Sequence, residues 1–126
     1  MNKDEAALDP MEVLRREYLA SLEDKMRGID EAWRALCGNG HVEQHLRTLL
    51  RLAHNLAGSS GLYGLREITD CARRLERELG QVTPGAAPPA TLVPQIDALL
   101  ERLASETRAV QSGPARPGAA PGVPLS

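Results

Sequence analysis

Aromatic residues are almost absent from this chain of 126 residues, which contains Trp33, Tyr18 and Tyr63 and no phenylalanine. The core must therefore be built from aliphatic side chains. The same shortage excludes a platform on which nucleic-acid bases stack. A net charge of −2 excludes the broad basic field that attracts a phosphate backbone. We expect no nucleic-acid partner.

Long apolar runs are also missing, and none approaches the roughly 20 residues that a membrane-spanning helix needs. Residues 1–20 carry many charges and do not resemble a secretory signal. The two cysteines, Cys37 and Cys71, lie far apart and form no CxxC pair, which is typical of reduced cysteines. We therefore expect a cytoplasmic protein without a membrane partner.

Proline is absent from residues 11–83, although the chain has nine prolines in total. Because an interior proline breaks a helix, this stretch is suited to long helices. Prolines and glycines gather in residues 80–90, a predicted loop, and in residues 112–126, a predicted disordered tail. The polar residues 1–8 form a predicted flexible N-terminus. Residues 9–111 remain for one folded domain.

The first predicted helix has a strong start signal. Asp9 can cap it, Pro10 suits its first position, and Glu12 completes a capping-box pattern. Gly28 could mark a bend, and Gly38 marks the end. Apolar residues recur three or four positions apart and form one stripe: Met11, Leu14, Tyr18, Leu22, Met26, Ile29, Trp33 and Leu36.

Three further helices are predicted, over about residues 40–61, over residues 65–79, and from Thr91 onward. Asn39 can cap the second, Thr91 can cap the fourth, and Pro94 falls in a first turn that tolerates proline. Their inward stripes are Val42, Leu46, Leu49, Ala53, Leu56 and Ser60; then Leu65, Ile68, Ala72, Leu75 and Leu79; then Leu92, Ile96, Leu99, Leu103, Thr107 and Val110. Four such helices with short connections predict an all-α, up-down-up-down four-helix bundle without strands.

The three histidines do not form a metal site in this arrangement. His41 and His45 share a helix face, but His54 lies about 180° from His45 at about 100° per residue. The string from His41 to His45 also lacks the glutamate that follows the first histidine in zinc proteases. We therefore expect no metal site and no resident cofactor.

His54 lies outside the inward stripe of its helix and can reach solvent. Within about 60° of it on the helical wheel lie six residues: Arg47, Leu50, Arg51, Ala57, Gly58 and Gly61. Each glycine costs a helix roughly 1 kcal/mol relative to alanine, and two of them here leave a lane beside the imidazole open to a partner. The two arginines favour a phosphoryl anion or an acidic partner, and the leucine offers an apolar contact. Alternatively, the glycines allow close helix packing or begin a turn.

Neutral imidazole is a competent nucleophile, so His54 could carry a phosphoryl group. The chain has no glycine-rich loop followed by lysine, and no obvious carboxylate cluster for Mg²⁺. It could therefore not take a phosphoryl group from ATP by itself. The metal and the acid chemistry would come from a partner.

The stretch from His54 to Gly64, HNLAGSSGLYG, closely resembles the signature of histidine-containing phosphotransfer (HPt) domains of two-component phosphorelays. The histidine is followed by leucine at the second position, glycine at the fourth and tenth, and small residues at the fifth and sixth. The stretch from Arg73 to Glu76 is also similar to the family. The resemblance covers roughly residues 10–110.

The resemblance implies that His54 accepts a phosphoryl group on Nε2 from a receiver-domain aspartate and relays it to another receiver. The receiver, possibly of a hybrid histidine kinase, would supply Mg²⁺ and dock over Leu50, Ala57, Gly58 and Gly61. The protein would be a monomeric phosphocarrier without ATP-dependent kinase activity of its own.

The chain departs from the family pattern at Ala57, where many members have lysine or arginine. The chain's only lysines are Lys3 and Lys25, which lie far from His54 in the sequence. Local positive charge is therefore expected from Arg47 and Arg51, or it is low.

Two other functions remain as alternatives. One is a non-catalytic adaptor bundle that binds receivers without carrying phosphate. The other is the phosphoacceptor domain of a histidine kinase, which is disfavoured because that class follows its histidine with an acidic residue and, four positions on, a proline. This chain has Asn55 and Gly58 there.

Overall fold

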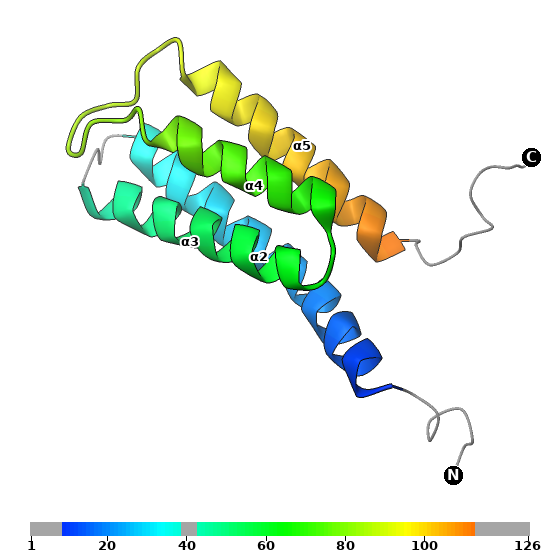
Figure 1. Ribbon diagram of the computed structural model, residues 1–126. Helices are drawn as coiled ribbons and strands as arrows, with labels where there is room; N and C mark the ends of the chain where they lie inside the picture. The colour runs from blue at the N-terminus through cyan, green and yellow to red at the C-terminus, as the bar shows by residue number, and fades with distance from the viewer. Residues whose placement is uncertain (1–8, 39–42, 113–126) are drawn as a thin grey trace, which may run out of the picture.

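A computed structural model describes residues 9–38 and 43–112 and shows four helices in them: α2 (Pro10–Cys37), α3 (Glu43–Leu62), α4 (Arg66–Leu79) and α5 (Val93–Ser112). Each helix packs against the next, and α5 returns to pack against α2 (Figure 1). The predicted all-α four-helix bundle is confirmed. No helix in the described ranges has the length and apolar character to cross a membrane.

Some expectations concern residues outside the described ranges. These are the flexible N-terminus at 1–8, the capping role of Asn39, the positions of His41 and Val42, and the tail over residues 113–126. Ser112, which the sequence assigns to the tail, is the last residue of α5.

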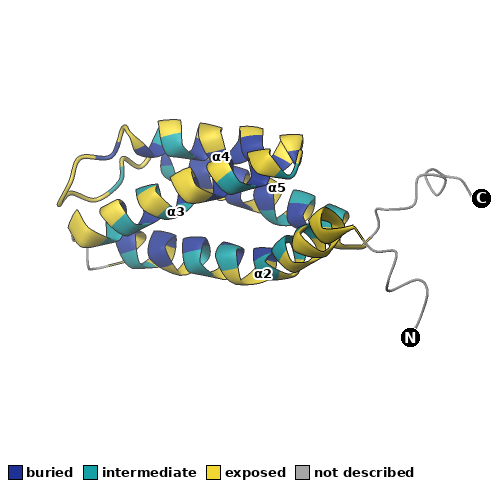
Figure 2. Ribbon diagram, turned by 60° about the horizontal axis from the view of Figure 1, so that its bottom comes forward, coloured by how far each residue is buried: buried dark blue, intermediate teal, exposed yellow. Residues whose placement is uncertain are grey.

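The core is aliphatic, as the composition predicts, and each helix turns one buried face toward it (Figure 2). Trp33 is the only tryptophan, and its indole N–H donates a hydrogen bond to Asp97 across the α2–α5 contact at 2.8 Å. Cys37 is exposed and Cys71 is buried, and both are free thiols. The largest fully buried hydrophobic side chains are Leu22, Ile29, Leu36, Leu49, Leu56, Ile68, Leu75, Leu79, Ile96 and Leu103.

Helix α2 begins where the capping signal predicts. The Asp9 carboxylate accepts a hydrogen bond from the Met11 backbone N–H at 3.1 Å, and Pro10 is the first helical residue. The inward assignment of Met11 and Leu14 is wrong, because they are 57% and 47% exposed. The first turns of α2 extend beyond the other helices, so no neighbour covers them (Figure 1).

Two details of the helices differ from the sequence expectation. The Leu92 carbonyl accepts the first helical bond of α5, from Ile96 at 3.0 Å, so Leu92 rather than Thr91 precedes this helix. Helix α2 continues through Gly28. A Cβ atom there would make only ordinary contact with the Leu52 side chain of α3, at 3.6 Å.

The turn between α3 and α4 fixes how these two helices pair. Gly64 has a φ of +70°, which glycine adopts without strain, and the Leu65 N–H reaches back to the Ser60 carbonyl at 3.1 Å. The buried Thr69 hydroxyl donates to the Leu65 carbonyl at 2.9 Å and lies 2.7 Å from the Ser60 hydroxyl. This buried hydroxyl contact joins α4 to α3 in one register, and a shift of α4 along α3 would break it.

A matched pair of leucines on α3 tests the core. Leu49→Ala should lower the free energy of unfolding by about 2–5 kcal/mol, because Leu49 is fully buried. Leu62→Ala should change it by about 0.5 kcal/mol or less, because Leu62 is 82% exposed. Urea unfolding followed by circular dichroism measures both. Equal losses in the two variants would contradict the packing described here.

Candidate functional site

His54 lies near the middle of α3, and 72% of its side chain is exposed. Its neighbours in sequence, Ala53 and Leu56, are buried and fix the rotation of α3 about its axis. The exposure that the helical wheel predicts for His54 is therefore present. The ring is held from the side by a residue of α4.

That residue is Glu76, whose Oε2 atom lies 2.9 Å from Nδ1 of His54. An ionised carboxylate can only accept a hydrogen bond, so Nδ1 carries the proton in the neutral imidazole. The lone pair then belongs to Nε2, the nitrogen that Glu76 does not contact. Glu76 thus selects the tautomer and the orientation of the ring, as carboxylates beside histidine do in other sites.

Glu76 is not singled out by the sequence as a functional residue, although the stretch from Arg73 to Glu76 is similar to the HPt family. The two partners are separated by 22 residues and lie on different helices. Only the register of α4 along α3 brings them together. A carboxylate on an exposed helix face has no sequence signal that distinguishes it from a solvated charge.

Gly58 and Gly61 follow His54 along the exposed face of α3 and form the open lane that the sequence predicts. A Cβ atom on Gly58 would meet nothing within 4 Å, so close packing inside this protein does not require glycine there. A Cβ atom on Gly61 would make only ordinary contact with Thr69, at 3.8 Å. Of the nearby glycines, Gly64 takes the turn conformation.

The other predicted docking residues are distributed on both sides of His54. Arg47 and Arg51 are exposed, and Leu50 is half-buried. Arg47 and Leu50 line a small hollow with Pro84 of the α4–α5 loop, on the side of His54 away from the glycine lane. The placement of Ala57 among exposed residues is wrong: it is 5% exposed, because α4 covers that side of α3 and widens the buried sector.

A cluster of polar contacts fixes the end of α3 beyond the glycine lane. The Tyr18 hydroxyl lies 2.6 Å from the Ser59 hydroxyl, and its ring stacks on Tyr63 with centroids 4.7 Å apart. Arg15 donates to the Tyr63 carbonyl at 2.6 Å. Burial raises the pKa of Tyr18, although its hydrogen bond to Ser59 acts in the opposite direction. Tyr18 therefore keeps its phenolic proton at neutral pH, and these contacts hold the end of α3 against α2.

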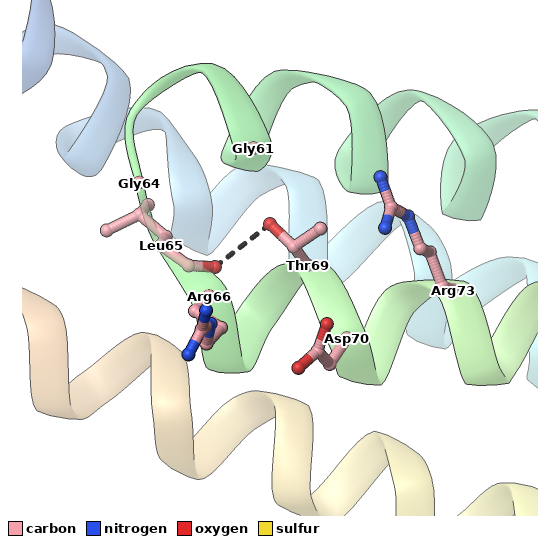
Figure 3. Close-up of a pocket in the computed structure, with 7 residues that line it drawn as sticks. All are labelled: Gly61, Gly64, Leu65, Arg66, Thr69, Asp70 and Arg73. Carbon is pink, nitrogen blue, oxygen red and sulfur yellow. Dashed lines mark hydrogen bonds between the residues drawn. The ribbon is translucent and has the colours of Figure 1, made fainter.

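Beside the lane, an open hollow of about 660 Å³ lies between the ends of α3 and α4 (Figure 3). Gly61 borders it from α3, and Thr69, Asp70 and Arg73 border it from α4. In the described ranges, no three histidine, cysteine, aspartate or glutamate side chains gather into a metal-binding group. His45 is half-buried on α3.

The fold and the site define a helical bundle that presents one oriented, accessible imidazole. The chain belongs to the Hpt domain family, whose model matches residues 13–106. Hpt domains act in histidine phosphotransfer in two-component phosphorelays, as phosphocarriers rather than kinases, and interact with receiver domains. The comparison with curated proteins and the comparison with solved structures each return no match.

Glu76→Gln should reduce the preference of His54 for the tautomer protonated at Nδ1, because an amide side chain can either donate or accept a hydrogen bond. Long-range imidazole ¹⁵N NMR at a pH where His54 is neutral should show Nδ1–H in the wild type and a mixture in the variant. Glu78→Gln is the matched control, since Glu78 lies on α4 beside Arg74 at 3.9 Å and not at the imidazole. An unchanged tautomer in Glu76→Gln would show that the carboxylate does not select it.

Proposed function

We propose that His54 accepts a phosphoryl group on Nε2 from an aspartyl phosphate of a receiver domain and passes it to the aspartate of another receiver. The observation that carries this proposal is the Nδ1 contact with Glu76, at 2.9 Å, on an open helix face. It makes Nε2 the free nucleophile. Membership of the Hpt family supports the class of reaction.

The transfer is a displacement at phosphorus. The Nε2 lone pair of His54 attacks, the new N–P bond forms, and the P–O bond to the receiver aspartate breaks as its carboxylate leaves. The proton on Nδ1 stays in its hydrogen bond to Glu76. The phosphorylated ring gains positive charge, which the Glu76 carboxylate offsets. The same step in reverse delivers the group to the next receiver.

The receiver supplies Mg²⁺ and the acidic groups of the reaction in this proposal. It docks over Leu50 and the lane of Gly58 and Gly61, where a partner backbone can approach the ring. Arg47 and Arg51 lie at the edge of that surface and attract an acidic partner. The buried Ala57 contributes little contact area. The carrier acts as a monomer in the cytoplasm.

Replacing the nucleophile tests this function directly. Incubation with a phosphorylated receiver and Mg²⁺ should label the wild type with acid-labile phosphate, and His54→Gln should remove the label while the far-ultraviolet circular dichroism stays unchanged. His45→Gln, on the same helix, is the matched control and should be labelled as the wild type. Equal labelling of His54→Gln would overturn the proposal. A wild type that binds receivers without label would indicate the adaptor function.

The glycine lane gives a second test. Gly58→Gln should slow transfer from the receiver about tenfold or more, because the new side chain occupies the approach path of a partner. Its stability should stay equal or rise by up to about 1 kcal/mol, since glycine is a poor helix former. Labelling by phosphoramidate, a small donor that needs no docking, should be unchanged. Unchanged transfer from the receiver would show that the lane is not an approach path.

A further inference from the structure

The phosphoryl group of the proposed intermediate carries negative charge, yet the site helix places its arginines, Arg47 and Arg51, only on the N-terminal side of His54. Position 57 is alanine, and its side chain is buried. Arg47 lies two helical turns before His54, in the hollow beside Pro84, and Arg51 lies one turn before His54. None of these three positions places a cation beside the first turn of the glycine lane, which follows His54. The helix across from α3 provides one.

The register of α4 along α3 identifies this cation. His54 pairs with Glu76, and Ser60 pairs with Thr69, so the two helices run in opposite directions in a fixed alignment. Moving three residues along α3 from His54 to Ala57 corresponds to moving three residues back along α4 from Glu76. The residue at that level is Arg73.

Arg73 lies on the face of α4 that is turned toward α3. It lies one turn from Glu76 and one turn from Thr69, the two residues of α4 that contact α3 in these pairs. Its side chain extends toward α3, whereas the Asp70 carboxylate points away from it (Figure 3). The guanidinium borders the hollow beside Gly61, and the residue is exposed.

The charge of Arg73 is also available. In the described part of the chain, no carboxylate lies within 4.0 Å of its guanidinium. The next residue is different: Arg74 lies 3.9 Å from Glu78 and borders a separate hollow with Gln95 of α5. The two adjacent arginines thus lie on different faces of α4, about 100° apart.

We propose that Arg73 binds the phosphoryl group on His54 and takes the place of a cation at position 57. The inference rests on the proposed function of His54. The levels of Arg73 and His54 differ by three residues, about 4.5 Å along the helix axis, which an extended arginine side chain spans. Its fork of N–H donors matches two phosphoryl oxygens. Glu76 holds Nδ1 while Arg73 approaches the group on Nε2, so opposite charges flank the phosphohistidine.

Phosphoramidate is the probe that isolates this role from docking. Nε2 of His54 forms the N–P bond as the P–N bond of phosphoramidate breaks and ammonia leaves. Arg73→Gln should slow labelling about 5- to 10-fold, the effect of losing one charge-assisted contact. Arg73→Lys keeps the charge and should retain most of the rate. Arg74→Gln is the matched control and should label as the wild type. Intact-mass spectrometry follows the phosphoprotein with time.

The outcomes separate this inference from the proposed function. A wild type that is not labelled at His54 would contradict the proposed function itself. A labelled wild type with an equally fast Arg73→Gln would overturn only the role of Arg73. Equal slowing of Arg73→Gln and Arg74→Gln would also overturn it, because the effect would then be one of net charge.

Relocating the cation gives a second test of its position. The double variant Ala57→Lys with Arg73→Gln should recover the wild-type labelling rate within about twofold, since positions 57 and 73 lie at the same level of the paired helices. A lysine can bury its stem at position 57 and still extend its ammonium group to the surface. Its circular dichroism should match the wild type. A folded double variant as slow as Arg73→Gln would contradict the placement of the cation at this level.

Discussion

The alignment of α3 with α4 is the constraint on which the site depends. The buried contact between the Ser60 and Thr69 hydroxyl groups, at 2.7 Å, exists only in this alignment, so sliding the helices would break it. That alignment places Glu76 opposite His54. A shift of one turn, about 5.4 Å, would remove the carboxylate from Nδ1 and release the ring. The chemistry of an exposed side chain is thus set by a contact in the core.

The glycine lane of α3 is a second feature that depends on the rest of the bundle, because glycines destabilise the helix that carries them. Glycine within a helix costs roughly 1 kcal/mol, and a side chain at position 58 would meet nothing inside the protein, so internal packing does not require glycine there. Burial of aliphatic side chains on the opposite face of α3 stabilises the helix and offsets this cost. The stacked Tyr18 and Tyr63 hold the end of the helix against α2. The bare backbone can therefore remain helical and accessible.

Periodicity within each segment predicts the helices and the exposure of His54, because both depend on the rotation of one helix. It does not reveal how far the neighbouring helices extend. Met11 belongs to an apolar stripe and is expected to face inward, but it is exposed because no neighbouring helix covers it. Periodicity also gives the wrong exposure for Ala57, because the width of the buried face of α3 depends on where α4 packs. The role of Glu76 needs the alignment of two helices, which no single-segment pattern contains.

A cation on α4 differs from one on α3 because its position relative to His54 depends on how the two helices pack. A lysine at position 57 would move with His54 as part of one helix. The proposed contact of the Arg73 guanidinium with the phosphoryl group and the contact of the Glu76 carboxylate with Nδ1 both come from α4 instead. Both charges then depend on the separation of α3 and α4. Any change in that packing would alter the tautomer and the anion contact together, so the site is as rigid as the helix pair that carries it.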